Sequence, residues 1–138
     1  MTGITNDEQE NIETVRAYLS ALASGAVGDD LARFFTSTAE QVELPNKLNP
    51  KGGKSDLASM LARAEQGRHL LGAQTYDIRS MVVRDELLAV EAEWSGTLAV
   101  PFGDLAPGFV MKAHFAMFFE FRNGRIRRQR NYDCFEPW

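Results

Sequence analysis

Apolar residues near the start of the chain recur at helical spacing. They follow one another at steps of three or four residues, with one tyrosine beside them: Ile12, Val15, Tyr18, Leu19 and Leu22. The spacing predicts a helix over residues 6 to 24 with one apolar stripe. Thr5 and Glu8 have the spacing of a capping box at its start, and Gly25 suits its end.

Two shorter helices follow in the pattern. Residues 28 to 35 predict a short helix, and residues 55 to 66 predict a third one that ends at Gly67. A short apolar run over residues 41 to 44, which stops at Pro45, predicts a first strand, and a loop covers residues 46 to 53.

The second half of the chain has the pattern of strands. Four runs rich in β-branched and aromatic residues cover 74 to 84, 87 to 99, 111 to 121 and 125 to 133. Asn123 and Gly124 predict a type I′ hairpin turn, Asp85 and Glu86 a second tight connection, and residues 101 to 108 a loop. The order of elements predicts one α+β domain over residues 1 to 138, with three helices before a curved, mostly antiparallel sheet.

Alternation along the strands assigns their faces. The odd-numbered positions from Met111 to Phe121 are all apolar and are predicted to face the core, as are Leu88, Val90, Ala92 and Trp94 on the preceding strand. The last strand has no apolar face. One side carries Ile126, Arg128, Arg130 and Tyr132; the other carries Arg127, Gln129, Asn131 and Asp133. Such a strand either lies open to water or lines a polar pocket on the concave side of the sheet.

Composition removes several classes of protein. The chain has 138 residues, one cysteine, two histidines and a net charge of −4. These numbers exclude a disulfide framework and a cysteine-rich zinc site. The acidic pI of about 5.2 argues against nucleic acid as a partner. There is no apolar run of membrane-spanning length and no signal peptide, so a cytoplasmic location is expected.

The net charge is unevenly distributed. Residues 1 to 111 carry 9 basic and 16 acidic residues, and residues 112 to 138 carry 6 and 3. Five arginines lie on the last hairpin: Arg122, Arg125, Arg127, Arg128 and Arg130. A solvated face paired with acidic neighbours is the first interpretation, and an anion site is the second.

The chain resembles the SnoaL-like polyketide cyclase branch of the nuclear transport factor 2-like superfamily. The resemblance rests on the order and spacing of segments 15–25, 42–45, 90–96, 119–126 and 130–133. It implies a cone-shaped barrel whose sheet wraps the first helix around an apolar pocket. Members include cyclases, ketosteroid isomerases, epoxide hydrolases, dehydratases and proteins without enzymatic activity. Many form homodimers through the outer sheet face, where Phe118 is expected.

Residue by residue, the resemblance is partial. Tyr18 stands where ketosteroid isomerases have the tyrosine that donates to an oxyanion, but Leu44 replaces their general base, and Ala116 or Met117 their second acid. Asn131 stands where cyclases and epoxide hydrolases have an aspartate. An asparagine can orient a substrate but cannot act as an acid or base.

The other family-typical groups are also replaced. Ala92 and Trp94 stand in place of the epoxide hydrolases' Arg-x-Asp pair. Asp133, two residues after Asn131, points to the same side and is predicted to act as the base instead. A structural ion pair with an arginine is the competing interpretation of Asp133.

The predicted site therefore has two catalytic residues, Asp133 and Tyr18, and six residues that bind substrate: Asn131, Gln129, Trp94, Phe115, Met117 and Glu43. For Glu43, Val42 and Leu44 claim the inner face, so Glu43 is exposed unless a bulge reverses the strand. The expected activity is acid-base chemistry on a small, apolar, oxygenated substrate without cofactor or metal. The alternative is a binding module of the same fold that does no chemistry.

Overall fold

A computed structural model describes residues 3–138. Three helices, α1 (Asn6–Ala23), α2 (Asp29–Ala32) and α3 (Leu57–Leu70), accompany one six-stranded sheet. The strands are β1 (Phe35–Glu43), β2 (Gly53–Asp56), β3 (Leu71–Arg84), β4 (Leu87–Leu98), β5 (Val110–Arg122) and β6 (Arg125–Phe135). Their order across the sheet is β2-β1-β6-β5-β4-β3, and every neighbouring pair is antiparallel except β1 and β6.

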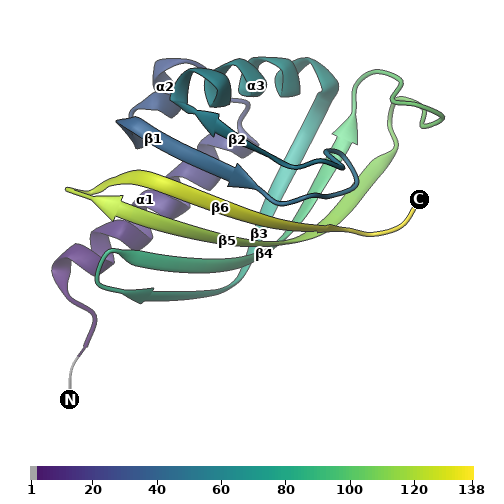
Figure 1. Ribbon diagram of the computed structural model, residues 1–138. Helices are drawn as coiled ribbons and strands as arrows, with labels where there is room; N and C mark the ends of the chain where they lie inside the picture. The colour runs from purple at the N-terminus through teal and green to yellow at the C-terminus, as the bar shows by residue number, and fades with distance from the viewer. Residues whose placement is uncertain (1–2) are drawn as a thin grey trace.

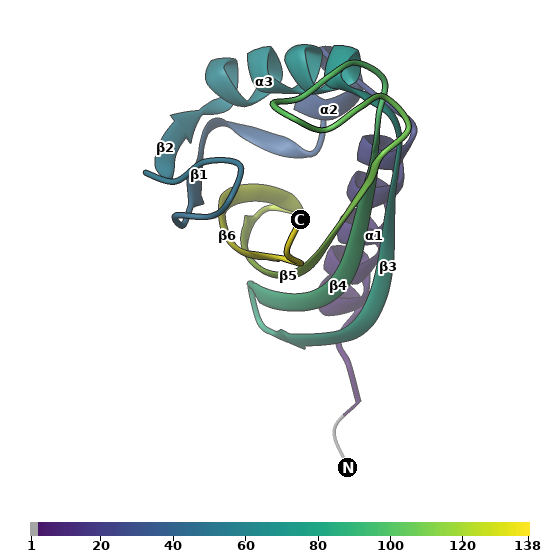
Figure 2. The ribbon, with the colours of Figure 1, turned by 90° about the vertical axis from the view of Figure 1, so that its right-hand side faces the viewer.

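The sheet is strongly curved. Figure 1 shows α1 behind the sheet and α3 across the top, and Figure 2 looks into the open end of the curve, where the last residues of the chain lie. Helix α1 packs within the curve, so its apolar stripe meets the concave face. Val15, Tyr18 and Leu19 are buried there. This arrangement confirms the predicted α+β cone with three helices and a mostly antiparallel sheet.

The local signals at the element ends are confirmed. The Thr5 hydroxyl accepts the backbone N–H of Glu8 at 3.1 Å, and Glu8 accepts the N–H of Thr5 at 2.9 Å, which completes the capping box. Asn123 and Gly124 both have positive φ, 51° and 79°, as the β5–β6 turn requires.

Several element boundaries were predicted wrongly. The first strand begins at Phe35 instead of residue 41, and β3 begins at Leu71 instead of residue 74. The second helix stops at Ala32, because Phe35 pairs with Ile126 and so belongs to β1. The third helix runs to Leu70, straight through Gly67. The short β2, Gly53–Asp56, lies where a loop and a helix start were predicted; its sequence is polar, because it pairs with β1 at the edge of the sheet.

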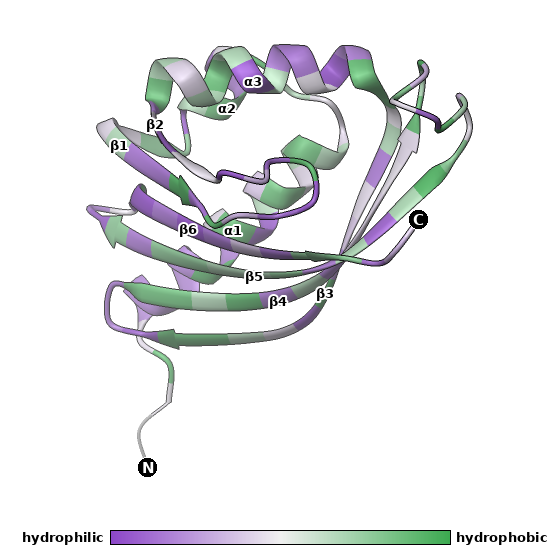
Figure 3. Ribbon diagram, turned by 45° about the vertical axis from the view of Figure 1, so that its right-hand side comes forward, coloured by the Kyte–Doolittle hydropathy of each residue, from purple (hydrophilic) through white to green (hydrophobic). Residues whose placement is uncertain are grey.

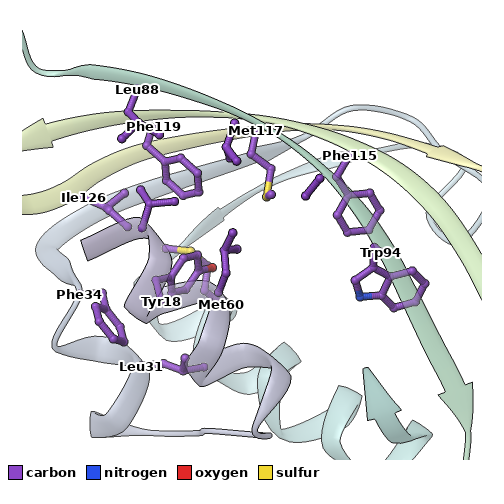
Figure 4. Packing of buried hydrophobic residues seen from close by; sticks show 14 of the residues in the cluster. Tyr18, Leu31, Phe34, Met60, Leu88, Trp94, Phe115, Met117, Phe119 and Ile126 are labelled. Atoms are coloured by element: carbon purple, nitrogen blue, oxygen red, sulfur yellow. The ribbon is translucent and has the colours of Figure 1, made fainter. Parts of the chain in front are cut away.

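The predicted core faces of β4 and β5 are confirmed. Along β5 every second residue from Met111 to Phe121 is buried, and along β4 so are Leu88, Val90, Ala92 and Trp94. Figure 3 shows apolar and polar residues alternating along the strands, and Figure 4 shows the buried side chains of the sheet meeting Tyr18 and Met60 from the helices.

The predicted faces of β6 were wrong at one position. Phe121 pairs with Ile126 but Glu120 pairs with Arg128, so Arg127 is an extra residue that forms a bulge. Beyond the bulge the alternation is reversed. Ile126 therefore shares the concave side with Gln129 and Asn131, both of which line a cavity, so the polar-pocket interpretation of this strand is the correct one.

A second irregularity lies in β1. The register with β6 shifts between Phe35 and Glu40. The shift does not change which residues face inward: Gln41 and Glu43 share the parity of the buried Phe35 and Ala39 and lie on the concave side with them. The expectation that Val42 and Leu44 would take the inner face, leaving Glu43 exposed, was therefore wrong.

Three of the arginines of the last hairpin form ion pairs with acidic residues. Arg127 and Arg130 both contact Glu120, and Arg128 lies 3.7 Å from Glu40. For these three residues the interpretation as a solvated face with acidic neighbours is confirmed.

Candidate functional site

A cavity of about 230 Å³ lies between the concave face of the sheet and the helices. Half of its lining is apolar: Leu22, Leu31, Phe35, Met60, Leu61, Ala64 and Met117. The other half is polar: Tyr18, Gln41, Glu43, Arg63, Tyr76, Gln129 and Asn131. A ligand inside would meet apolar side chains and hydrogen-bonding groups. Four of the polar residues, Gln41, Glu43, Gln129 and Asn131, lie together on β1 and β6 and form a polar wall.

Strand register assembles the polar wall. Gln129 lies beside Gln41, and Asn131 lies beside Glu43, in the parallel pair β1–β6. Across β5, Asn131 is paired with Met117 and Asp133 with Phe115. Gln129, Asn131 and Asp133 therefore occupy successive rows along the concave face.

Tyr18 begins a buried hydrogen-bond chain. Its hydroxyl donates to Oε1 of Gln129 at 3.2 Å, and Nε2 of Gln129 donates to Oδ1 of Asn131 at 2.7 Å. Three phenylalanines, Phe34, Phe35 and Phe119, contact the Tyr18 ring edge-on. Burial raises the pKa of Tyr18, so its hydroxyl stays protonated and acts as a donor.

A second network joins helix α3 to strand β1. Arg63 donates through Nη1 to Glu43 at 3.1 Å and through Nη2 to Oε1 of Gln41 at 2.5 Å. Asn46 donates to the other oxygen of Glu43 at 2.6 Å. Both carboxylate oxygens of Glu43 thus have fixed donors.

Asp133 has no such donors. Its Oδ1 is buried and has no hydrogen-bond partner among the residues that the structure describes. Burial, and secondarily the negative charge of Glu43, raise the pKa of Asp133 to about 7. Arg130 does not pair with it, because Arg130 contacts Glu120 instead. An aspartate that titrates near neutrality can both accept and release a proton.

Five of the eight predicted site residues line the cavity: Tyr18, Glu43, Met117, Gln129 and Asn131. Asp133, Trp94 and Phe115 do not line it. Trp94 stacks on Phe115 with ring centroids 5.4 Å apart, and its indole N–H donates to Gln74 at 3.0 Å. These two rings lie side by side, away from Tyr18 (Figure 4). Asp133, beside Phe115, is one row further along β6 than Asn131.

Three polar cavity residues were missed by the sequence analysis. Tyr76 stands on β3 at the same parity as Ile78, which packs against the core, so alternation could have found it. Arg63 follows Met60 by three residues and could have been placed on the same helix face. Gln41 is at the same parity as the buried Phe35 and Ala39, so alternation could have found it, but the predicted strand began only at residue 41.

Two absences are observed within residues 3–138. No group of three or more His, Cys, Asp or Glu side chains is placed to hold a metal ion. No helix of this part is long and apolar enough to cross a membrane.

Several solved structures of known proteins share the fold of this chain. A proposed hydroxylase, AclR from Streptomyces galilaeus, superposes with a TM-score of 0.77 at 12% identity, covering 94% of this chain and 82% of that one. A proposed SnoaL-like polyketide cyclase from Jannaschia sp. CCS1 gives 0.77 at 15% identity, covering 96% and 91%. A proposed polyketide cyclase from Xanthomonas campestris pv. campestris gives 0.77 at 20% identity, covering 92% of each chain. At these identities the likeness establishes the fold and not the chemistry.

Sequence comparisons address the family directly. No curated protein gives a significant match. The family model of the SnoaL-like domain matches residues 15–129. This range includes the second half of α1, strands β1 to β5, the first part of β6, and six of the seven polar cavity residues, Asn131 being the exception. The chain belongs to the SnoaL-like domain family, within the nuclear transport factor 2-like superfamily.

Proposed function

We propose that the protein is a cofactor-independent acid-base enzyme of the cyclase, dehydratase or isomerase type, acting on a small, apolar, oxygenated substrate. One observation carries the proposal: Asp133, with a buried and unpartnered carboxylate oxygen and a pKa of about 7, stands one row beyond a cavity with one polar wall. Groups that titrate near the working pH are the most effective proton carriers.

The roles follow from the positions. The Asp133 carboxylate accepts a proton from a carbon next to a carbonyl, and the electron pair moves onto the carbonyl oxygen. Asn131, Gln129 and Tyr18 orient that oxygen. The neutral Asp133 then returns a proton to another atom of the substrate, so no oxidant or reductant is consumed. Met117 supplies apolar wall, and Trp94 and Phe115 flank Asp133.

Proton exchange tests this role without the natural substrate. We expect the protein to accelerate deuterium uptake at the carbon next to the carbonyl of 1-indanone in D2O, followed by NMR, with a rate that rises through about pH 7. Asp133→Asn should lower the catalysed rate at least about tenfold, because a positioned base contributes roughly 10² to 10⁴. Asp77→Asn, an exposed aspartate beside Arg79, is the control. An unchanged rate in Asp133→Asn would overturn the assignment.

The alternative is a binding module that does no chemistry. It is favoured by the donation of the Tyr18 hydroxyl to Gln129 rather than to the cavity. Binding of 1-indanone by the wild-type protein with no acceleration of exchange would select this alternative.

We also propose that the protein forms a homodimer through the convex face of the sheet. Phe118 and Tyr132 contact one another there, with centroids 5.8 Å apart, and Tyr132 is 44% exposed. Ala89 lies beside both Phe118 and Val82, and Val82 is 68% exposed. Exposed apolar residues gathered on one sheet face are typical of a contact between subunits.

A further inference from the structure

We propose that Arg63 and Gln41 set the direction of a hydrogen-bond relay along the cavity wall, and that the relay ends in the side-chain NH2 of Asn131, which donates to a carbonyl or enolate oxygen of the substrate. This inference rests on the proposed function and deepens it. It adds two positioning residues and states which chemical group the substrate must present at Asn131.

The relay starts at Arg63 because a guanidinium only donates hydrogen bonds. Nη2 of Arg63 contacts the side-chain oxygen of Gln41, so the orientation of the Gln41 amide is set: oxygen toward Arg63, NH2 away from it. The ion pair of Arg63 with Glu43 holds the guanidinium in place. If the Gln41 amide were flipped, its NH2 group would face the N–H groups of Arg63, and neither could accept a hydrogen bond from the other.

The NH2 of Gln41 is then the group that serves Tyr18. Gln41 and Tyr18 line the same cavity, and Gln41 lies beside Gln129, which accepts a hydrogen bond from the Tyr18 hydroxyl. The Gln41 side chain also offsets a small part of the rise in pKa that burial imposes on Tyr18. A hydroxyl that accepts from Gln41 has its own proton left to donate. That proton goes to Oε1 of Gln129 at 3.2 Å.

Gln129 passes the direction on. With its oxygen engaged by Tyr18, its NH2 donates to Oδ1 of Asn131 at 2.7 Å. Gln129 is only 1% exposed. The remaining group is Nδ2 of Asn131, which makes no hydrogen bond with any residue of the described chain and belongs to a residue that lines the cavity. Hydrogen bonds that all point one way polarise and strengthen each other, by about 10 to 30% per bond.

The position of Asn131 explains why its donor matters. Asn131 and Asp133 are alternate residues on one face of β6, so their Cα atoms are roughly 6.6 Å apart. This spacing lets a substrate oxygen bind at Asn131 while its neighbouring carbon faces Asp133. The substrate class is a ketone or enol, with an oxygen that accepts a hydrogen bond beside the reacting carbon.

Binding of two molecules of matched shape tests the relay. 1-Indanone has a carbonyl oxygen and indane lacks it. Their affinities are measured by NMR titration at pH 8.5, where Asp133 is ionised and cannot donate to a ketone. We expect Asn131→Leu to weaken 1-indanone binding by about 2- to 12-fold, the value of one neutral hydrogen bond, and to leave indane binding within twofold.

Two substitutions of Gln41 separate the relay from the last contact. Gln41→Leu interrupts it and should weaken 1-indanone binding about twofold or more. Gln41→Glu reverses the relay, because the introduced carboxylate accepts hydrogen bonds from both Arg63 and Tyr18. The Tyr18 hydroxyl must then accept from the NH2 of Gln129. The oxygen of Gln129 in turn accepts from the NH2 of Asn131, which leaves the Asn131 oxygen facing the cavity. The loss for 1-indanone should then equal or exceed that of Asn131→Leu. Arg68→Met, on the same helix as Arg63 but outside this cavity, is the control.

The outcomes are distinct. The relay is overturned if Gln41→Glu keeps 1-indanone affinity within 1.5-fold of wild type, or if Asn131→Leu does. A second measurement covers variants that fold poorly: in the wild-type protein the Asn131 side-chain NH2 signals should shift on adding 1-indanone and not on adding indane. If Asp133→Asn abolishes deuterium exchange but the Gln41 variants bind 1-indanone like wild type, the proposed enzyme stands and the relay is rejected. If the Gln41 variants lose affinity but Asp133→Asn has no effect on exchange, the relay stands as part of a binding module.

Discussion

At the scale of single residues, the contrast between Glu43 and Asp133 is central. Glu43 has donors on both oxygens, from Arg63 and Asn46, whereas Asp133 has a buried oxygen without a partner in the described part of the chain. Burial without hydrogen bonds favours the neutral form of a carboxyl group. Two carboxyl groups of unequal environment thus stand on adjacent strands, and Asp133 is suited to exchange a proton near neutrality.

The raised pKa of Asp133 predicts a pH-dependent stability. Between the ordinary value of 3.8 and about 7, the folded protein retains a proton that the unfolded chain has released. Rising pH therefore favours unfolding over this interval, and the loss stops above about pH 7. Each pKa unit is worth about 1.4 kcal/mol, so Asp133→Asn should gain up to a few kcal/mol over wild type between pH 4.5 and pH 8. Urea unfolding at both pH values measures the difference in unfolding free energy between the variant and wild type. A difference that does not change with pH contradicts the prediction.

The same pair predicts the effect of changing Glu43. Burial is the larger cause of the Asp133 shift and the charge of Glu43 the smaller one. Glu43→Gln should therefore lower the pKa of Asp133 but leave it above 3.8. The Asp133 carboxyl carbon is followed by NMR across pH. The control is Glu40→Gln. It removes a negative charge from β1, the strand of Glu43, but this charge pairs with Lys54, so the titration of Asp133 should stay unchanged.

At the scale of elements, one irregularity completes the polar wall. The bulge at Arg127 turns Gln129 and Asn131 inward, beside Gln41 and Glu43 of β1, which share the parity of the buried Phe35 and Ala39. Because side chains alternate along a strand, one extra residue moves every later side chain to the other face.

Deletion of Arg127 is the test of the bulge. Without it, either Ile126 leaves the core or Gln129 leaves the cavity, so we expect a loss of several kcal/mol in unfolding free energy, as for other disrupted cores. Arg127→Ala keeps the residue count and removes only an exposed ion pair with Glu120, which is worth about 1 kcal/mol or less. Equal stabilities of the two variants in urea unfolding would show that the bulge is not needed.

At the scale of the whole molecule, the concave and convex faces of the curved sheet differ in what they carry. The concave side encloses the cavity, and the convex side carries Phe118, Tyr132 and Val82. A stable subunit contact buries roughly 1,200 to 2,000 Å² in total, and the broad convex face is the surface of the sheet that α1 leaves uncovered (Figure 2).

The proposed dimer predicts a change in mass. Tyr132→Asp puts a charge into the contact and should convert a dimeric wild type into a monomer in sedimentation equilibrium. Val100→Asp, at an exposed apolar residue of the loop between β4 and β5, should stay dimeric. A monomeric wild-type protein contradicts the proposal.

The accuracy of the sequence-based prediction varied with the range of the interactions involved. The capping box of Thr5 and Glu8, the turn at Asn123 and Gly124, and the apolar face of β5 depend on neighbours along the chain, and all three were predicted. The helix end near Phe35 and the face of Glu43 depend on pairing with distant strands, and both were missed.

The sequence by itself determined the class of fold, the α1 helix and the core faces of β4 and β5, because spacing and alternation are local properties. It also named five residues that line the cavity. Only the tertiary structure decided that Arg63 donates to both Gln41 and Glu43 and that Asp133 has no arginine partner within residues 3–138. The physical reason is that bulges and hydrogen-bond partners arise where separate strands and helices meet, and no periodicity within one strand records them.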